Sequence, residues 1–136
     1  MIKQITIFVE NKFGRFAKII ETIGKNNIDI SALSIADTTD YGIIRMIVND
    51  PELTVKVLKE SGVIAKITDV IAVAIDDRPS GLSMVVNALT ENEISIDYLY
   101  AFTGKIEGKA LMVVKTDNMD KTVKVLKENN IEIHDF

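Results

Sequence analysis

The residues best suited to bind a small anion lie in two short turns. NKFGR at 11–15 follows an apolar run at 2–10, and DRPSG at 77–81 follows another at 70–76. Each turn precedes a helical pattern, so it holds the unpaired backbone N–H groups and the positive dipole end of a helix start. Carboxylates bind at such places, and glycine lets them approach the backbone closely. Both turns are therefore candidate anion sites.

Structural explanations of the same residues stay open. Gly14 is equally explained by turn geometry alone, and Asn11 and Asp77 by helix capping. Lys12 and Arg15, in contrast, put positive charge at a helix start, which costs about a few tenths of a kcal/mol against the helix dipole. This misfit favours an anion-binding role for the first turn.

The two turns belong to two copies of one repeated unit. The heptapeptide TVKVLKE occurs at 54–60 and again at 122–128. Identity at a nearly constant spacing indicates an internal duplication. A shift of 66 positions also aligns Ile5 with Ile71, Asn26 with Asn92, Ile28 with Ile94, Ile30 with Ile96, Leu33 with Leu99, Gly42 with Gly108, Met46 with Met112 and Val48 with Val114.

Each copy shows the pattern strand, helix, strand, strand, helix, strand. The first helix has apolar residues at i, i+3, i+4 and i+7, over 16–23 in one copy and 82–89 in the other. In the first copy, Asp50 and Pro51 predict the start of the second helix, and Gly62 predicts its end.

This order predicts an α+β fold of two tandem ferredoxin-like βαββαβ domains, residues 1–68 and 69–136. Two interlocked right-handed crossovers give each domain an antiparallel sheet of order 4-1-3-2, with both helices on one face. The second strands, 30–37 and 94–102, would be bare apolar edges. We expect these edges to pair side by side, within one chain or between two, into an eight-stranded sheet.

Composition argues against several classes of function. The net charge of −4, with no basic run, argues against nucleic acid as a partner. No apolar run reaches the roughly 20 residues that cross a bilayer, and the N-terminus lacks the pattern of a signal peptide. We therefore expect a cytoplasmic protein with no membrane partner. Because cysteine is absent and His134 is the only histidine, we expect no metal or other cofactor.

Both turns resemble the strand, (D/N)-x-P-G-x-L, helix signature of ACT domains. DRPSGL at 77–82 keeps the Asp, the Pro and the Leu, with Ser80 where the family has glycine and Gly81 one place later. NKFGRF at 11–16 keeps Gly14 and the final apolar residue, but has Asn for the Asp and Phe for the Pro. The resemblance covers the whole chain as two tandem copies.

Two longer segments are similar to stand-alone proteins that consist of two ACT domains. These are ENKFGR at 10–15 and SALSIADTTDYG at 31–42. Such proteins are amino-acid-binding regulators. The resemblance implies an amino acid ligand at the seam where the turn of one domain meets strand 2 of its neighbour.

The resemblance also implies which residues would contact the ligand. Gly14 and Arg15 are expected to hold its carboxylate, and the second strands are expected to supply acceptors for its ammonium group. Tyr98 and Tyr100 are also explained by interface packing, and Asp37 by turn chemistry. The expected ligand-binding residues are Asn11, Lys12, Phe13, Gly14, Arg15, Ser34, Asp37, Asp77, Ser80, Gly81, Tyr98 and Tyr100.

Three functions compete at this point. The first is a non-catalytic amino-acid sensor whose occupancy is coupled to domain arrangement, to a homodimer, or to a metabolic enzyme or regulator as partner. The second is a protein–protein interaction module with a vestigial pocket, which the altered signature residues Phe13 and Ser80 would fit. The third is an enzyme of the acylphosphatase type, for which Asn11, Gly14 and Arg15 are suitable residue types but the glycine-rich phosphate cradle is missing. We expect the first, without catalytic residues.

Overall fold

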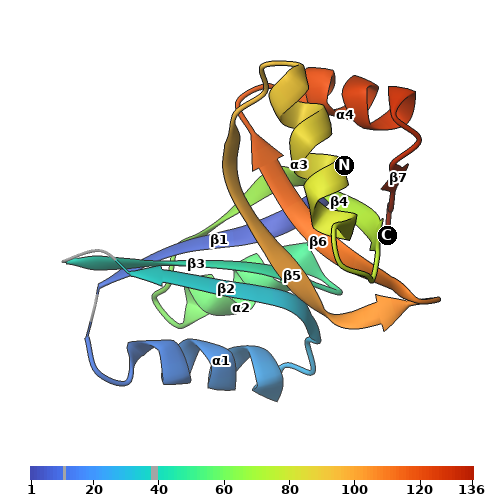
Figure 1. Ribbon diagram of the computed structural model, residues 1–136. Helices are drawn as coiled ribbons and strands as arrows, with labels where there is room; N and C mark the ends of the chain where they lie inside the picture. The colour runs from blue at the N-terminus through green and yellow to red at the C-terminus, as the bar shows by residue number, and fades with distance from the viewer. Residues whose placement is uncertain (11, 38–39) are drawn as a thin grey trace. The chain divides into compact units, whose positions relative to one another are not determined.

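The computed structural model describes residues 1–10, 12–37 and 40–136 (Figure 1). The chain divides into two compact units, and each is described by itself. The first unit is Lys3–Asp69, and the second is Val70–Phe136 together with Met1–Ile2.

The first unit contains four strands and two helices in the predicted order. They are β1 (Ile2–Glu10), α1 (Arg15–Lys25), β2 (Ile30–Asp37), β3 (Tyr41–Val48), α2 (Pro51–Glu60) and the beginning of β4 (Ala65–Asp76). β3 pairs antiparallel with β1 and with β2, and β1 also pairs with β4. The order within this unit is therefore β4-β1-β3-β2, and α1 and α2 lie on the same face of it (Figure 1).

The second unit repeats the arrangement. It contains the rest of β4, α3 (Gly81–Glu91), β5 (Ile96–Ile106), β6 (Lys109–Thr116), α4 (Met119–Glu128) and β7 (Glu132–Ile133). β4 pairs antiparallel with β6 and β7, and β6 pairs with β5. The order β7-β4-β6-β5 matches that of the first unit, so the duplication is visible in the strand pairing as well as in the sequence.

Helix starts follow the capping chemistry expected from the sequence. The Asp50 side chain accepts a hydrogen bond from the Leu53 N–H at 3.1 Å, with Pro51 at the first helical position of α2. Asn118 caps α4 in the same way, through the Lys121 N–H at 3.1 Å. Each cap satisfies one of the N–H groups that a helix start leaves unpaired.

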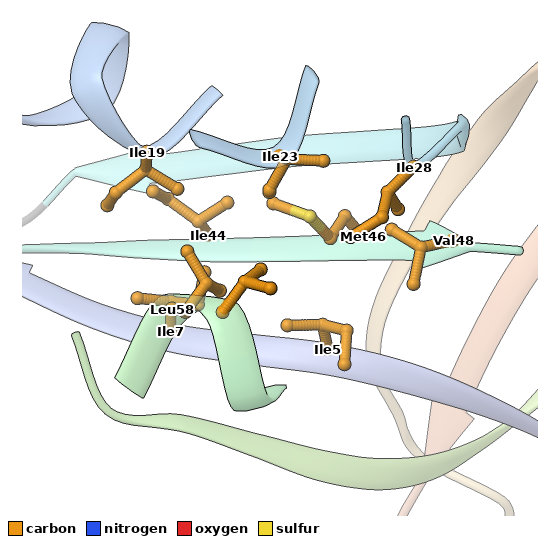
Figure 2. Close-up of a cluster of buried hydrophobic side chains, with 10 residues drawn as sticks. Ile5, Ile7, Ile19, Ile23, Ile28, Ile44, Met46, Val48 and Leu58 are labelled. Carbon is orange, nitrogen blue, oxygen red and sulfur yellow. The ribbon is translucent and has the colours of Figure 1, made fainter. Parts of the chain in front are cut away.

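Each unit has its own hydrophobic core between its helices and its sheet. Figure 2 shows the first core, where Ile19 and Ile23 of α1 and Leu58 of α2 meet the strands. The strand residues are every second one along β1 and β3, because alternate side chains point to the same face. They are Ile5, Ile7, Ile44, Met46 and Val48. The second core uses the corresponding positions Ile71, Val73, Val85, Leu89, Val114 and Leu126, among others.

The predicted open, eight-stranded sheet is wrong. β4 runs without a break from Ala65 to Asp76, so one strand closes the first repeat and opens the second, and seven strands remain in the described residues. The junction around Ile67, Thr68 and Val70 is β-branched and has no Gly or Pro to interrupt a strand. The strand order is closed rather than open, because it runs β1-β3-β2-β5-β6-β4 and β4 pairs with β1 again. Closure removes bare edges, the hazard that the open sheet would have carried.

Two strand ends also differ from expectation. β5 continues to Ile106, past the predicted end at 102, and turns at Glu107 and Gly108, both with positive φ. Two residues with positive φ make the tight turn whose twist suits a hairpin. The final strand, which the repeated pattern predicted, is only two residues long, Glu132–Ile133.

Truncation of the first core should destabilise the protein strongly. Ile23 is fully buried, and Ile23→Ala is expected to lower the free energy of unfolding by about 2–5 kcal/mol, because it removes apolar contacts and leaves a cavity. Ile64→Ala is the control, since Ile64 is 69% exposed. Urea denaturation measures both variants. Equal stability of the two would contradict the assigned core.

Candidate functional site

The first turn is built around a left-handed glycine. Gly14, with φ of 81°, precedes α1, and a side chain at that φ would be strained. The Lys12 N–H donates to the Glu10 carbonyl oxygen at 2.8 Å, and the Arg15 N–H donates to the Lys12 carbonyl oxygen at 3.2 Å. This tight reversal places two cations, Lys12 and Arg15, at the positive end of the α1 dipole.

A cavity of ≈ 190 Å³ lies beside this turn, within the first unit. Its walls come from the end of β1, the turn, the start of α1, and the adjoining ends of β2 and β3. The lining residues are Val9, Glu10, Lys12, Arg15, Phe16, Ile35, Asp37, Gly42 and Ile44. Charged and apolar side chains thus share one small space.

The charges around the cavity are of both signs. The Lys12 Nζ lies 2.8 Å from Glu10 Oε2, and the hydrogen bond and positive charge of Lys12 hold the pKa of Glu10 below its ordinary value. Arg15 forms no ion pair with any residue that the structure describes. Asp37 adds a carboxylate from β2. A guanidinium and a carboxylate that line one cavity suit a zwitterion such as a free amino acid.

The sheet register explains how these residues meet. Asp37 of β2 lies opposite Gly42 of β3, and Gly42 lies opposite Val9 of β1. Two residues further along β3, Ile44 lies opposite Ile35. All five therefore lie on the helix-facing side, because they alternate with residues of the other face. The Asp37 carboxylate lies at the strand ends, whereas the apolar side chains of Ile35 and Ile44 lie further along the strands.

The second turn has the same backbone but different chemistry. Ser80 occupies the position of Gly14, and its φ of 69° is left-handed although it is not glycine. The Arg78 guanidinium pairs with the Asp76 carboxylate at 3.5 Å, and Lys105 pairs with Asp77. The cations near this turn are thus engaged by carboxylates of the same unit. The positive charges of Arg78 and Lys105 are therefore already balanced by carboxylates at the second turn.

Gly81 is required by the close approach of two backbone segments. A Cβ at Gly81 would lie 2.1 Å from the Asp76 carbonyl oxygen. The glycine that stands one place late in the second signature is therefore explained by sterics. In the first copy the corresponding position holds Arg15, so the two turns have diverged in the residue that follows the left-handed position.

The structure brings together only some of the residues expected from the sequence. Lys12, Arg15 and Asp37 line one cavity, whereas Ser34 points to the opposite face of β2. Phe13 is fully exposed at the turn, and Asn11 lies outside the described residues. In the second unit, Asp77, Ser80 and Gly81 lie in or next to the second turn, and the rings of Tyr98 and Tyr100 on β5 stack at 6.3 Å. A ligand seam between the copies stays a prediction.

Six cavity residues were not among those expected. Strand alternation could have found Ile35, because it shares the face of Asp37 and not that of Ser34. The cross-strand neighbours needed the register of β1, β2 and β3, which periodicity alone does not supply. The six are Val9, Glu10, Phe16, Ile35, Gly42 and Ile44.

Two further searches concern the described part of the chain only. Within residues 1–10, 12–37 and 40–136, no three His, Asp or Glu side chains are grouped so as to hold a metal ion. Every helix in the same residues is too short or too polar to cross a membrane.

A family model described as an ACT domain pair matches residues 1–135. The chain belongs to the ACT-domain family. The predicted resemblance is confirmed, and the model's description as a pair agrees with the repeated βαββαβ units. A search of curated proteins finds no match for this ACT-domain protein.

Solved structures agree with the family assignment. The protein BT0572 from Bacteroides thetaiotaomicron is 38% identical, with a TM-score of 0.89, and the match covers 98% of this chain and 91% of that one. The regulatory subunit of aspartate kinase from Thermus thermophilus is 11% identical, with a TM-score of 0.65 and coverage of 93% and 91%. The corresponding subunit from Thermus flavus is 13% identical, with a TM-score of 0.62 and coverage of 94% and 92%. At these low identities the two subunits show similarity of fold alone.

Substitution of Gly81 should test the close approach at the second turn. Gly81→Ala is expected to lower the free energy of unfolding by about 1–3 kcal/mol, because its Cβ collides with backbone. Gly24→Ala, in the open part of α1, is the matched control and should stabilise by up to about 1 kcal/mol through helix propensity. Thermal and chemical denaturation measure both. A neutral Gly81→Ala would refute the steric account.

Proposed function

We propose that this ACT-domain protein is a non-catalytic regulatory protein that binds a free amino acid. The observation that carries the proposal is the cavity of the first unit, where Lys12 and Arg15 share a small space with Asp37. The α-carboxylate of the ligand pairs with Arg15 and Lys12, and its ammonium group pairs with Asp37. Charge-assisted hydrogen bonds of this kind are stronger than neutral ones.

Binding would regulate by linkage rather than by chemistry. A ligand shifts a conformational equilibrium only by its difference in affinity for the two states, typically about 1–3 kcal/mol. We propose that occupancy biases the arrangement of the two units, of a cytoplasmic homodimer, or of a complex with a metabolic enzyme or regulator. The regulatory subunits of aspartate kinase from Thermus thermophilus and Thermus flavus have a similar fold, which agrees with a regulatory role.

A thermal-shift screen of the common amino acids tests the proposal. A ligand that binds the folded state raises the melting temperature, and its stabilisation grows with the logarithm of its concentration above Kd, reaching about 2.7 kcal/mol at 100 times Kd. Titration calorimetry then gives the affinity. A complete panel without any shift or heat would refute amino-acid binding.

Removal of the Arg15 guanidinium should weaken binding selectively. Arg15→Ala is expected to lower the affinity for the amino acid found in the screen by about 10- to 100-fold, because it removes a charged hydrogen bond worth about 1.5–3 kcal/mol. Arg78→Ala is the matched control, because Arg78 lies in the second turn and is paired with Asp76. Calorimetry compares the two, with melting temperatures as a folding check. Equal losses would contradict a site at the first turn.

A protein–protein interaction module is the second candidate function. Phe13 favours it, because a fully exposed aromatic residue at a turn is a common contact in interfaces. This function would be favoured over the sensor if a partner copurifies with the wild-type protein but not with Phe13→Ala, and if no amino acid changes the melting temperature.

A further inference from the structure

Gly42 has no structural reason to be glycine. It is buried in β3, and its φ is not among the positive ones. A Cβ there would meet Val9 Cγ2 at 3.4 Å and the Ala36 carbonyl oxygen at 3.8 Å, which are ordinary contacts. Glycine inside a strand costs stability through backbone entropy and lost packing. The position therefore carries a cost that neither the backbone conformation nor the packing explains.

The missing side chain of Gly42 leaves space in the cavity. Gly42 lines that cavity between Val9 and Asp37, its two cross-strand partners. A larger side chain at this position would share the helix-facing side with Ile44 and would point into the same space. Glycine in a strand often marks a place where a ligand comes close to the backbone. Gly42 is such a place, next to the carboxylate of Asp37.

The rest of the cavity is apolar. Ile44 is 1% exposed and forms its base, with Ile35 opposite on β2 and Phe16 on α1. Ile35 is 50% exposed and Phe16 is 36% exposed, so two large apolar side chains next to the charged groups keep contact with water. A ligand with an apolar side chain would cover them, which is favourable in proportion to the area removed from water.

We propose that this cavity selects amino acids with an apolar side chain, such as the branched aliphatic ones, and that Gly42 is a specificity-determining residue. The main chain of the ligand lies over Gly42, between Arg15 and Asp37, and its side chain lies against Ile35 and Ile44. The inference rests on the proposed function, because it names the ligand class of the same cavity.

The apolar part of the lining disfavours a charged ligand side chain. An acidic or basic side chain that lies against Ile35 and the buried Ile44 would lose hydration at its charge. Burial of an unpaired charge is strongly unfavourable.

Calorimetric titration with valine, leucine, isoleucine, alanine, aspartate, lysine and tryptophan tests the ligand class. The three branched amino acids are expected to bind at least about tenfold more tightly than alanine, because methylene groups in an apolar pocket discriminate by about 10- to 200-fold. Tightest binding of aspartate or lysine would overturn the class but leave the proposed function intact. No binding of any amino acid would refute the proposed function itself.

Gly42→Val tests the role of the missing side chain. It is expected to weaken binding of the best branched ligand at least about 100-fold without a lower melting temperature, because valine is favoured in strands. Ala36→Val is the matched control, since Ala36 is exposed on the other face of β2 and should bind as wild type. Unchanged affinity in Gly42→Val would overturn the role of Gly42. If Gly42→Val does not fold, Gly42→Ala is measured under the same criterion, with an expected loss of at least about tenfold.

Ile35→Ala separates selectivity from general damage to the site. It is expected to reduce the preference for leucine over alanine at least about tenfold while affinity for alanine itself is unchanged, because only the side-chain contact is lost. Equal loss for leucine and alanine would show that Ile35 does not contact the ligand side chain.

Discussion

The structure depends on a single backbone constraint, the left-handed residue between a strand and the following helix. At Gly14 this residue reverses the chain so that α1 lies back on the sheet that β1 has just entered. The reversal brings Ile19 and Ile23 to Ile44 and Met46 in the core of the first unit (Figure 2). The same reversal leaves Lys12 and Arg15 above the ends of three strands. Core and candidate site therefore share one geometric origin.

The second copy keeps this constraint but lacks the residue that suits it best. Ser80 is left-handed, a conformation that costs about 1–2 kcal/mol for a residue with a side chain. The next residue, Gly81, must be glycine, because a Cβ there would collide with the Asp76 carbonyl oxygen. Because Arg78 and Lys105 pair with local carboxylates, charge at this turn is used for structure. Duplication thus preserved the fold while the chemistry of the two turns diverged.

The cavity of the first unit is lined by residues that are unfavourable for local stability, which is a mark of a ligand site. Arg15 opposes the dipole of α1, and Gly42 weakens the strand that it belongs to. Both residues are locally unfavourable, and both line the same cavity. Residues that break local rules gather at functional sites, where a ligand compensates for them. Ile35 and Phe16, exposed and apolar, fit the same explanation.

The amino-acid sequence by itself determined the element order, the duplication, the helix cap at Asp50, and the family, because each of these depends on local spacing or on residue identity. Only the tertiary structure decided that β4 continues through Thr68 and Asp69, since no local signal separates a linker from an uninterrupted strand. The cavity, too, could be identified only from the tertiary structure. Asp37 and Gly42 become neighbours through strand register, and register follows from the packing of a whole face rather than from any short stretch of sequence.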